Sequence, residues 1–112
     1  MSDAKVQKLQ LLEQNAQQLL AQRQQFQQSL LEVDSALGEL DKTKEAYKII
    51  GNIMVATEKE DLKKDLKQKK ETTELRIKTL EKQEEDVKEK AKKLQDEVLK
   101  DMESKKWVQN IS

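Results

Sequence analysis

The side chains that could carry chemistry in this sequence are almost all carboxylates and amines. A cluster such as Glu84, Glu85 and Asp86 would support general acid–base catalysis only inside a pocket that shifts the pKa of one carboxyl group. These three acidic residues are instead predicted to lie on the surface of a helix. A structure made of two packed helices, as predicted below, has no cavity wide enough to enclose a substrate. Histidine and cysteine are absent, which removes zinc and most transition-metal sites. We therefore expect no cofactor and no enzymatic activity.

Binding sites for phosphate, calcium, nucleic acid and lipid also lack a sequence signature. The two glycines stand thirteen residues apart, so no glycine-rich phosphate loop is present, and no calcium-binding loop is found. Lys and Arg total 22 and Asp and Glu total 22, which leaves no basic surplus for nucleic acid. No apolar stretch approaches about 20 residues, and an interfacial helix would need a basic polar face. We expect neither nucleic acid nor a membrane as a partner.

The composition indicates long helices rather than a globular core. Charged residues make up 39% of the chain, which holds only one Phe, one Tyr and one Trp. With no proline and two glycines there are few turn signals, so the segments must be long. We predict a mainly α chain that forms a single subunit, with an N-terminal helix at 4–44, a β-hairpin at 46–57, a C-terminal helix at 58–104 and a tail at 105–112. The absence of cysteine leaves the redox compartment unmarked and is compatible with the cytosol, and Met1-Ser2-Asp3 does not begin a signal peptide, so we expect a soluble cytoplasmic protein.

Apolar residues recur at alternating steps of three and four along both predicted helices, a spacing typical of a coiled coil. Folding back at the hairpin brings the two ladders together as a long antiparallel two-helix coiled coil. In this register Ala16 faces Ala91, and Arg23 faces Glu84. We predict an ion pair between Arg23 and Glu84 in this seam; the alternative is that both side chains extend outward past it. The ladder of the first helix is Leu9, Leu12, Ala16, Leu19, Arg23, Phe26, Leu30, Val33, Leu37 and Leu40, and that of the second is Leu66, Lys70, Thr73, Ile77, Leu80, Glu84, Val87, Ala91, Leu94 and Val98.

The hairpin sequence AYKIIGNIMVAT interrupts these helices near the middle of the chain. Gly51-Asn52 between β-branched runs suits a two-residue type II′ turn, and alternation would group Tyr47 and Ile49 with Ile53 and Val55. A lone hairpin is marginal in water, so we predict that it builds a sheet between molecules. The alternative is a plain turn whose isoleucines pack on the helix ends. The predicted assembly residues are Tyr47, Ile49, Ile50, Gly51, Asn52, Ile53, Met54 and Val55.

Apolar residues also gather near both ends of the chain, where several leave the strict ladder. Exposed apolar surface at a mobile end marks an interaction site, and Leu and Met side chains adapt to varied partners. We therefore predict that these ends bind non-native proteins. The alternative is that the residues complete the seam and Trp107 folds back over it; the role of the ending WVQNIS stays open. The predicted binding residues are Val6, Leu9, Leu12, Leu99, Met102 and Trp107.

Two stretches of the sequence resemble β-type subunits of prefoldin, most closely archaeal ones. They are YKIIGNIMVATEKEDLKKDL at 47–66 and ELRIKTLEKQEEDVKEK at 74–90. The resemblance covers nearly the whole chain. It implies a hexamer of two α-type and four β-type subunits, so that the partners would be α-type subunits and other copies of this chain. It further implies that the tips of the coiled coils hold non-native clients and transfer them to a group II chaperonin without ATP. The competing hypothesis is a structural coiled-coil scaffold or tether that oligomerises through the hairpin.

Overall fold

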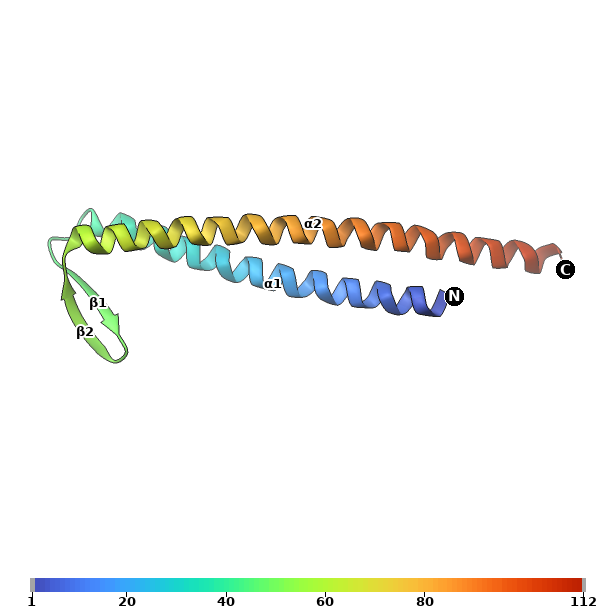
Figure 1. Cartoon of the computed structure of the whole chain (residues 1–112), viewed down its shortest axis with the longest axis horizontal. Coiled ribbons are helices and arrows are strands. Elements are labelled where there is room, and N and C mark those ends of the chain that lie inside the picture. Colours follow the sequence, from blue (N-terminus) through green and yellow to red (C-terminus); the bar gives the residue numbers. More distant parts are fainter. Residues whose placement is uncertain (1, 112) are drawn as a thin grey trace. The chain divides into compact units, whose positions relative to one another are not determined.

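The computed structural model describes the backbone of residues 2–111 and the side chains of residues 3–104. Four elements follow one another in the described chain: helix α1 (Ser2–Leu40), strand β1 (Ala46–Ile50), strand β2 (Ile53–Thr57) and helix α2 (Lys59–Ile111) (Figure 1). The prediction of two long helices joined by a β-hairpin is confirmed. Within the described residues, neither helix contains a stretch long and apolar enough to cross a membrane.

The helix bounds differ from the sequence prediction at all four ends, by only one residue at the start of α2. Helix α1 begins at Ser2 and ends at Leu40, and its last turn tightens because the N–H groups of Lys42 and Thr43 both donate to the Glu39 carbonyl, at 3.0 and 3.1 Å. Helix α2 continues to Ile111. No proline or glycine interrupts residues 105–111, so the segment expected as a separate tail extends the helix instead.

The chain packs as two compact units, each of which contains part of both helices. The hairpin unit comprises Arg23–Thr79 and therefore holds β1 and β2. The terminal unit comprises Met1–Gln22 and Leu80–Ser112. In each unit the α1 and α2 segments run in opposite directions, so each unit can be described as a short antiparallel helix pair.

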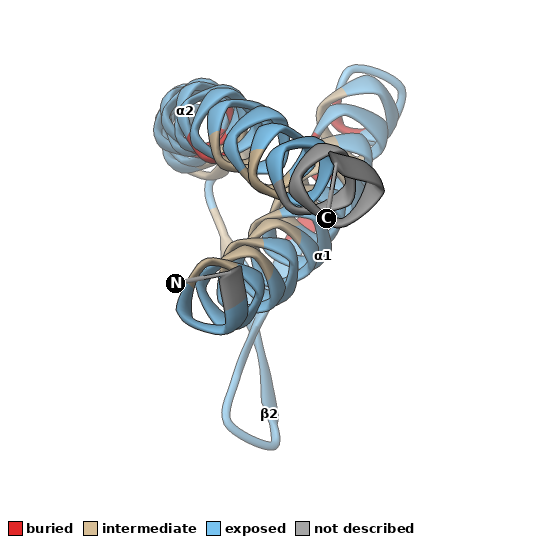
Figure 2. Ribbon diagram, turned by 90° about the vertical axis from the view of Figure 1, so that its right-hand side faces the viewer, coloured by how far each residue is buried: buried red, intermediate tan, exposed pale blue. Residues whose placement is uncertain are grey.

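The predicted ladder forms the buried stripe of both units. Every ladder residue is buried or half-buried, and Figure 2 shows the buried positions on the sides of the helices that face each other. Thr73 is buried in spite of its hydroxyl group, which donates to the Lys69 carbonyl at 2.7 Å and so does not need a partner across the seam. The periodicity therefore identifies the packed face correctly. Its most buried apolar members are Val33, Leu40, Ile77, Leu80 and Val87.

Two ion pairs one heptad apart flank the seam of the hairpin unit. The Lys70 ammonium lies 2.9 Å from an Asp34 carboxylate oxygen, and the Lys63 ammonium lies 3.1 Å from Asp41. Both lysines lie on the ladder side of α2, where their stems cover apolar surface while the charged ends reach acids on α1. The hydrogen bond from Lys63 lowers the pKa of Asp41 below its ordinary value of 3.8, and Lys59 and Lys67 add to the effect.

This lowered pKa predicts an acid-dependent loss of stability. The folded chain holds the Asp41 proton more weakly than the unfolded chain does. The contribution of ionised Asp41 to the free energy of unfolding is therefore present above the ordinary aspartate pKa and is lost as pH falls through the lowered pKa. In thermal unfolding followed by circular dichroism, the stability difference between wild type and Asp41→Asn should shrink on acidification. In a Lys63→Gln background most of that pH dependence should disappear. If the stability of wild type and of Asp41→Asn changed with pH in parallel, this pH dependence could not be assigned to Asp41.

Candidate functional site

The hairpin turn has the geometry that its sequence predicts. Ile50 pairs with Ile53, which leaves Gly51 and Asn52 as a two-residue loop. Gly51 has a φ of 61°, and Asn52 is not among the residues with positive φ. Positive φ at the first loop position alone is the mark of a type II′ turn, which suits the right-handed twist of the strands.

The register corrects the expected grouping of side chains on the two faces of the hairpin. Directly paired residues lie on the same face, so Ile49 shares a face with Met54, and Ile50 shares the other with Ile53. Tyr47 and Ile49 therefore do not lie beside Ile53, as strict alternation through the turn would suggest. The reason is that the two turn residues reverse the chain, and counting alternation across them shifts the second strand by one position. Both faces remain largely apolar.

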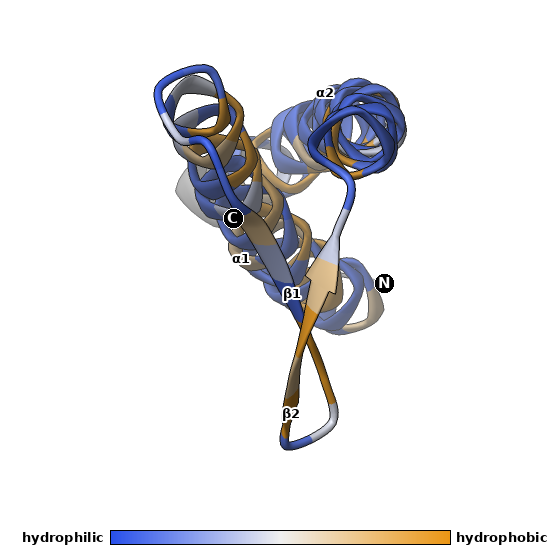
Figure 3. Cartoon of the chain, turned by 90° about the vertical axis from the view of Figure 1, so that its left-hand side faces the viewer, coloured by the Kyte–Doolittle hydropathy of each residue, from blue (hydrophilic) through white to orange (hydrophobic). Residues whose placement is uncertain are grey.

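The hairpin exposes its apolar side chains on both faces. Its six large apolar residues are between 38% and 72% exposed, with Ile49 the most exposed, and Figure 3 shows the apolar stretch along the strands on either side of the turn. Only Ala46, at the base of the hairpin, is buried. The alternative in which the isoleucines pack on the helix ends is therefore wrong. The exposed residues are Tyr47, Ile49, Ile50, Ile53, Met54 and Val55.

A local hydrogen bond fixes the aromatic ring at the base of β1. The Tyr47 hydroxyl donates to the Glu45 carboxylate at 2.7 Å, and this bond raises the pKa of Tyr47 above its ordinary value. Because the hydroxyl is satisfied within the hairpin unit, the apolar ring is available to an apolar partner without leaving a polar group unpaired.

The terminal unit exposes part of the predicted binding residues and packs others. Leu99 and Met102 are 52% and 59% exposed, and Val6 is exposed as well. Leu9 and Leu12 are half-buried in the seam, so for these two the structure agrees with the alternative that they complete the coiled coil. The side chain of Trp107 lies outside the described residues. Two exposed leucines, Leu11 and Leu20, belong to the same unit and were absent from the predicted set.

An ion pair extends the seam of the terminal unit beyond its last apolar layer. The Lys5 ammonium lies 2.9 Å from Asp101 and 3.7 Å from Glu97, and its hydrogen bond to Asp101 raises the pKa of Lys5 above its ordinary value. This contact is not among those predicted from the sequence. Lys5 stands four residues before Leu9 and Asp101 three after Val98, so extending both ladders by one step would have found it.

The predicted pair of Arg23 and Glu84 falls in different units. Arg23 belongs to the hairpin unit and Glu84 to the terminal unit. Both are half-buried, as their ladder positions require, and neither is without an interaction partner. Their mutual ion pair stays a prediction.

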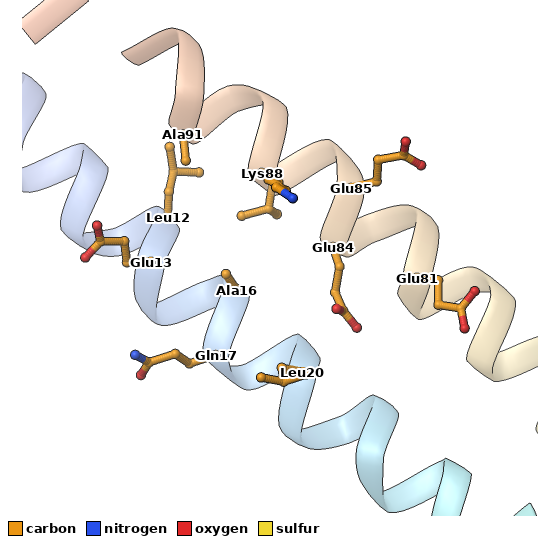
Figure 4. Close-up of a pocket in the computed structure, with 11 residues that line it drawn as sticks. Leu12, Glu13, Ala16, Gln17, Leu20, Glu81, Glu84, Glu85, Lys88 and Ala91 are labelled. Atoms are coloured by element: carbon orange, nitrogen blue, oxygen red, sulfur yellow. The ribbon is translucent and has the colours of Figure 1, made fainter. Parts of the chain in front are cut away.

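A groove of about 600 Å³ lies between the helices of the terminal unit, open to solvent (Figure 4). Its centre is the layer where two small residues, Ala16 and Ala91, occupy ladder positions, so that less side-chain volume fills the seam. Leu12, Leu20 and Val87 complete the apolar lining. The sequence predicts no cavity able to enclose a substrate, and this space is a groove open to solvent. Its remaining lining residues are Glu13, Gln17, Glu81, Glu84, Glu85 and Lys88.

A second, smaller hollow of about 250 Å³ is lined mainly by basic and apolar residues of the same unit. Helical spacing places Lys8, Lys90 and Lys93 on the opposite side of the seam from the larger groove. The two sides of this helix pair therefore differ in charge. Among the described residues, no three acidic side chains are grouped so that they could hold a metal ion.

Comparison with known proteins gives one consistent family. The family described as prefoldin subunit matches residues 3–105. Prefoldin subunit beta of Archaeoglobus fulgidus is 46% identical over 87 residues, which are 75% of each chain. That of Methanothrix thermoacetophila is 38% identical over 93 residues, covering 80% of this chain and 78% of the relative. The crystal structure of the prefoldin beta subunit from Thermococcus strain KS-1 is similar with a TM-score of 0.81 and 33% identity, over 87% of this chain and 88% of that one.

Proposed function

Since this chain belongs to the prefoldin family as a β-type subunit, we propose that it is an ATP-independent chaperone subunit that binds unfolded proteins. In this proposal the hairpin assembles the chain with α-type subunits and other β-type copies into a hetero-hexamer. The helix ends hold non-native clients and pass them to a group II chaperonin in the cytoplasm. The absence of cysteine suits that reducing compartment.

The exposed hairpin supports the assembly step. A two-stranded ribbon leaves two open edges and, in this chain, two apolar faces. Open edges pair readily with further strands, and exposed apolar side chains gain stability when another copy covers them. The proposed assembly surface comprises Tyr47, Ile49, Ile50, Gly51, Asn52, Ile53, Met54 and Val55.

The exposed apolar residues of the terminal unit support the client-binding step. Leu99 and Met102 are more than half exposed, and Val6 lies on the antiparallel segment of the same unit. Flexible aliphatic side chains adapt to unrelated sequences, which a chaperone for many clients requires. Each contact is weak, so several subunits acting on one client would supply the affinity through avidity. Lys5 and Asp101 would hold the two helices together beside this surface.

Light scattering of a denatured client tests this function. We expect the purified full chain, mixed with its α-type partner, to suppress aggregation of a chemically denatured client in the absence of ATP. A structural scaffold or tether built on the same hairpin would leave the aggregation unchanged. Native mass spectrometry of the same mixture would show whether the hetero-hexamer forms. Transfer to the chaperonin is tested separately, by refolding of the held client after a group II chaperonin and ATP are added.

A further inference from the structure

We propose that the groove at Ala16 and Ala91 is a docking site for client segments in which aliphatic residues stand next to lysine or arginine. This inference rests on the proposed chaperone function and adds a chemical preference to it. The ligand is a short stretch of a non-native protein, and the preference arises from the groove lining and its rim.

The size and lining of the groove suit a few aliphatic side chains. Its volume of about 600 Å³ lies within the range of ordinary ligand sites, roughly 300–1,000 Å³. The apolar part of the lining consists of Leu12, Ala16, Leu20, Val87 and Ala91, which offer no hydrogen-bonding side-chain groups, and beside it stands Glu84, a half-buried carboxylate that has an interaction partner of its own. An incoming aliphatic side chain that packs on these five residues would gain burial without the cost of stripping water from their side chains.

The rim of the groove is acidic. Glu13 lies on α1, and Glu81 and Glu85 lie on α2, all three exposed; Glu84 points from α2 toward the space between the helices, while Glu85 points away from α1 (Figure 4). Lys88 is the one basic residue of the lining. Because the whole chain has a formal net charge of zero, a charge preference must come from such a local arrangement. A lysine or arginine beside the buried aliphatic residues would meet carboxylates on either margin.

The same side of the helix pair carries most of the exposed apolar residues of the terminal unit. Val6, Glu13 and Leu20 are spaced seven apart and form one row on α1, and Glu81, Lys88 and Met102 lie on one row of α2 by the same spacing. Leu99 falls on this side as well. Apolar and acidic side chains therefore alternate along the α1 row of the groove side, the α2 row contains Glu81, Lys88 and Met102, and the opposite side has the lysine-rimmed hollow. A cationic apolar segment fits the groove side only.

Fluorescence anisotropy with two labelled peptides tests the preference. Both peptides carry the same central leucines, flanked in one by lysines and in the other by glutamates. We expect the full-length chain to bind the lysine-flanked peptide about 3- to 10-fold more tightly at low ionic strength, as a few exposed charge pairs allow. The preference should fade at about 1 M salt. Equal affinities, or no binding of either peptide, would overturn the proposal.

Three variants locate the effect in the groove. The triple variant Glu13→Gln, Glu81→Gln and Glu85→Gln should lose the preference. A matched triple variant in the hairpin unit, Glu32→Gln, Glu39→Gln and Glu71→Gln, removes the same charge elsewhere and should keep it. Leu20→Gln, which changes a partly exposed lining residue, should lower the binding affinity of both peptides by the same factor. Loss of the preference in the hairpin-unit variant, or an unchanged preference in the groove variant, would sink the proposal.

The aggregation assay separates failure of this inference from failure of the proposed function. A chain that suppresses client aggregation but binds both peptides equally is a chaperone without this preference. A chain that suppresses no aggregation contradicts the proposed function itself.

Discussion

Replacing Ile49 and Ile53 by aspartate is expected to divide the assembly into smaller species while the helical content stays unchanged. The two isoleucines lie on opposite faces of the hairpin, so the variant introduces one charge on each face. Loss of two buried isoleucines costs about 1.5–3 kcal/mol each in the assembly, which weakens association by roughly 10²- to 10⁴-fold. An unpaired carboxylate in an apolar contact adds to this cost. Sedimentation velocity and far-ultraviolet circular dichroism measure the two outcomes.

The chain offers a matched control for this experiment. Leu31 and Leu75 are 62% and 66% exposed, comparable to Ile53, and both lie on helices of the hairpin unit. The variant Leu31→Asp with Leu75→Asp adds the same charge at the same exposure, away from the strands. We expect it to sediment as wild type. If the hairpin variant also keeps the wild-type size, the hairpin is only a turn and the assembly surface lies elsewhere.

The ladder and the turn could be predicted from sequence because each depends on local spacing. Residues three and four apart share a side of a helix, so the buried stripe from Leu9 to Leu40 follows from counting alone. Gly51 likewise marks the turn position that needs positive φ. These features need no knowledge of what lies across the seam.

The features that the sequence analysis missed depend on relations between segments. The grouping of side chains on the hairpin faces depends on which residues pair across the turn. The contact of Lys5 with Asp101 and Glu97 needs the register at the far end of the seam. The predicted register already places Ala16 opposite Ala91, but the space that two small residues leave there depends on how closely the helices approach each other, which residue spacing does not give. Long-range placement, and not local propensity, separates these cases from the ladder.

Replacing Val6, Leu99 and Met102 by glutamine should abolish most of the client binding without unfolding the arm. All three side chains are exposed in the terminal unit, so the folded chain loses little packing, and glutamine is tolerated in helices. Each contact with a client is worth about 1 kcal/mol of apolar burial, so the three together weaken one arm by roughly 100-fold. Light scattering should show that about tenfold or more subunit is needed for half-suppression of aggregation.

The pair Leu31 and Leu75 distinguishes a specific client-binding surface from non-specific binding to any exposed leucine. Leu31→Gln with Leu75→Gln removes exposed apolar surface of the hairpin unit by the same type of substitution. If clients bind wherever leucine is exposed, this variant should lose protection as well, in proportion to the area removed. If clients bind only at the terminal unit, it should protect as wild type does, and native mass spectrometry should show both variants fully assembled. If the variant with glutamine at Val6, Leu99 and Met102 protected clients fully, client recognition would not depend on these three residues. The helix ends would then only extend the coiled coil.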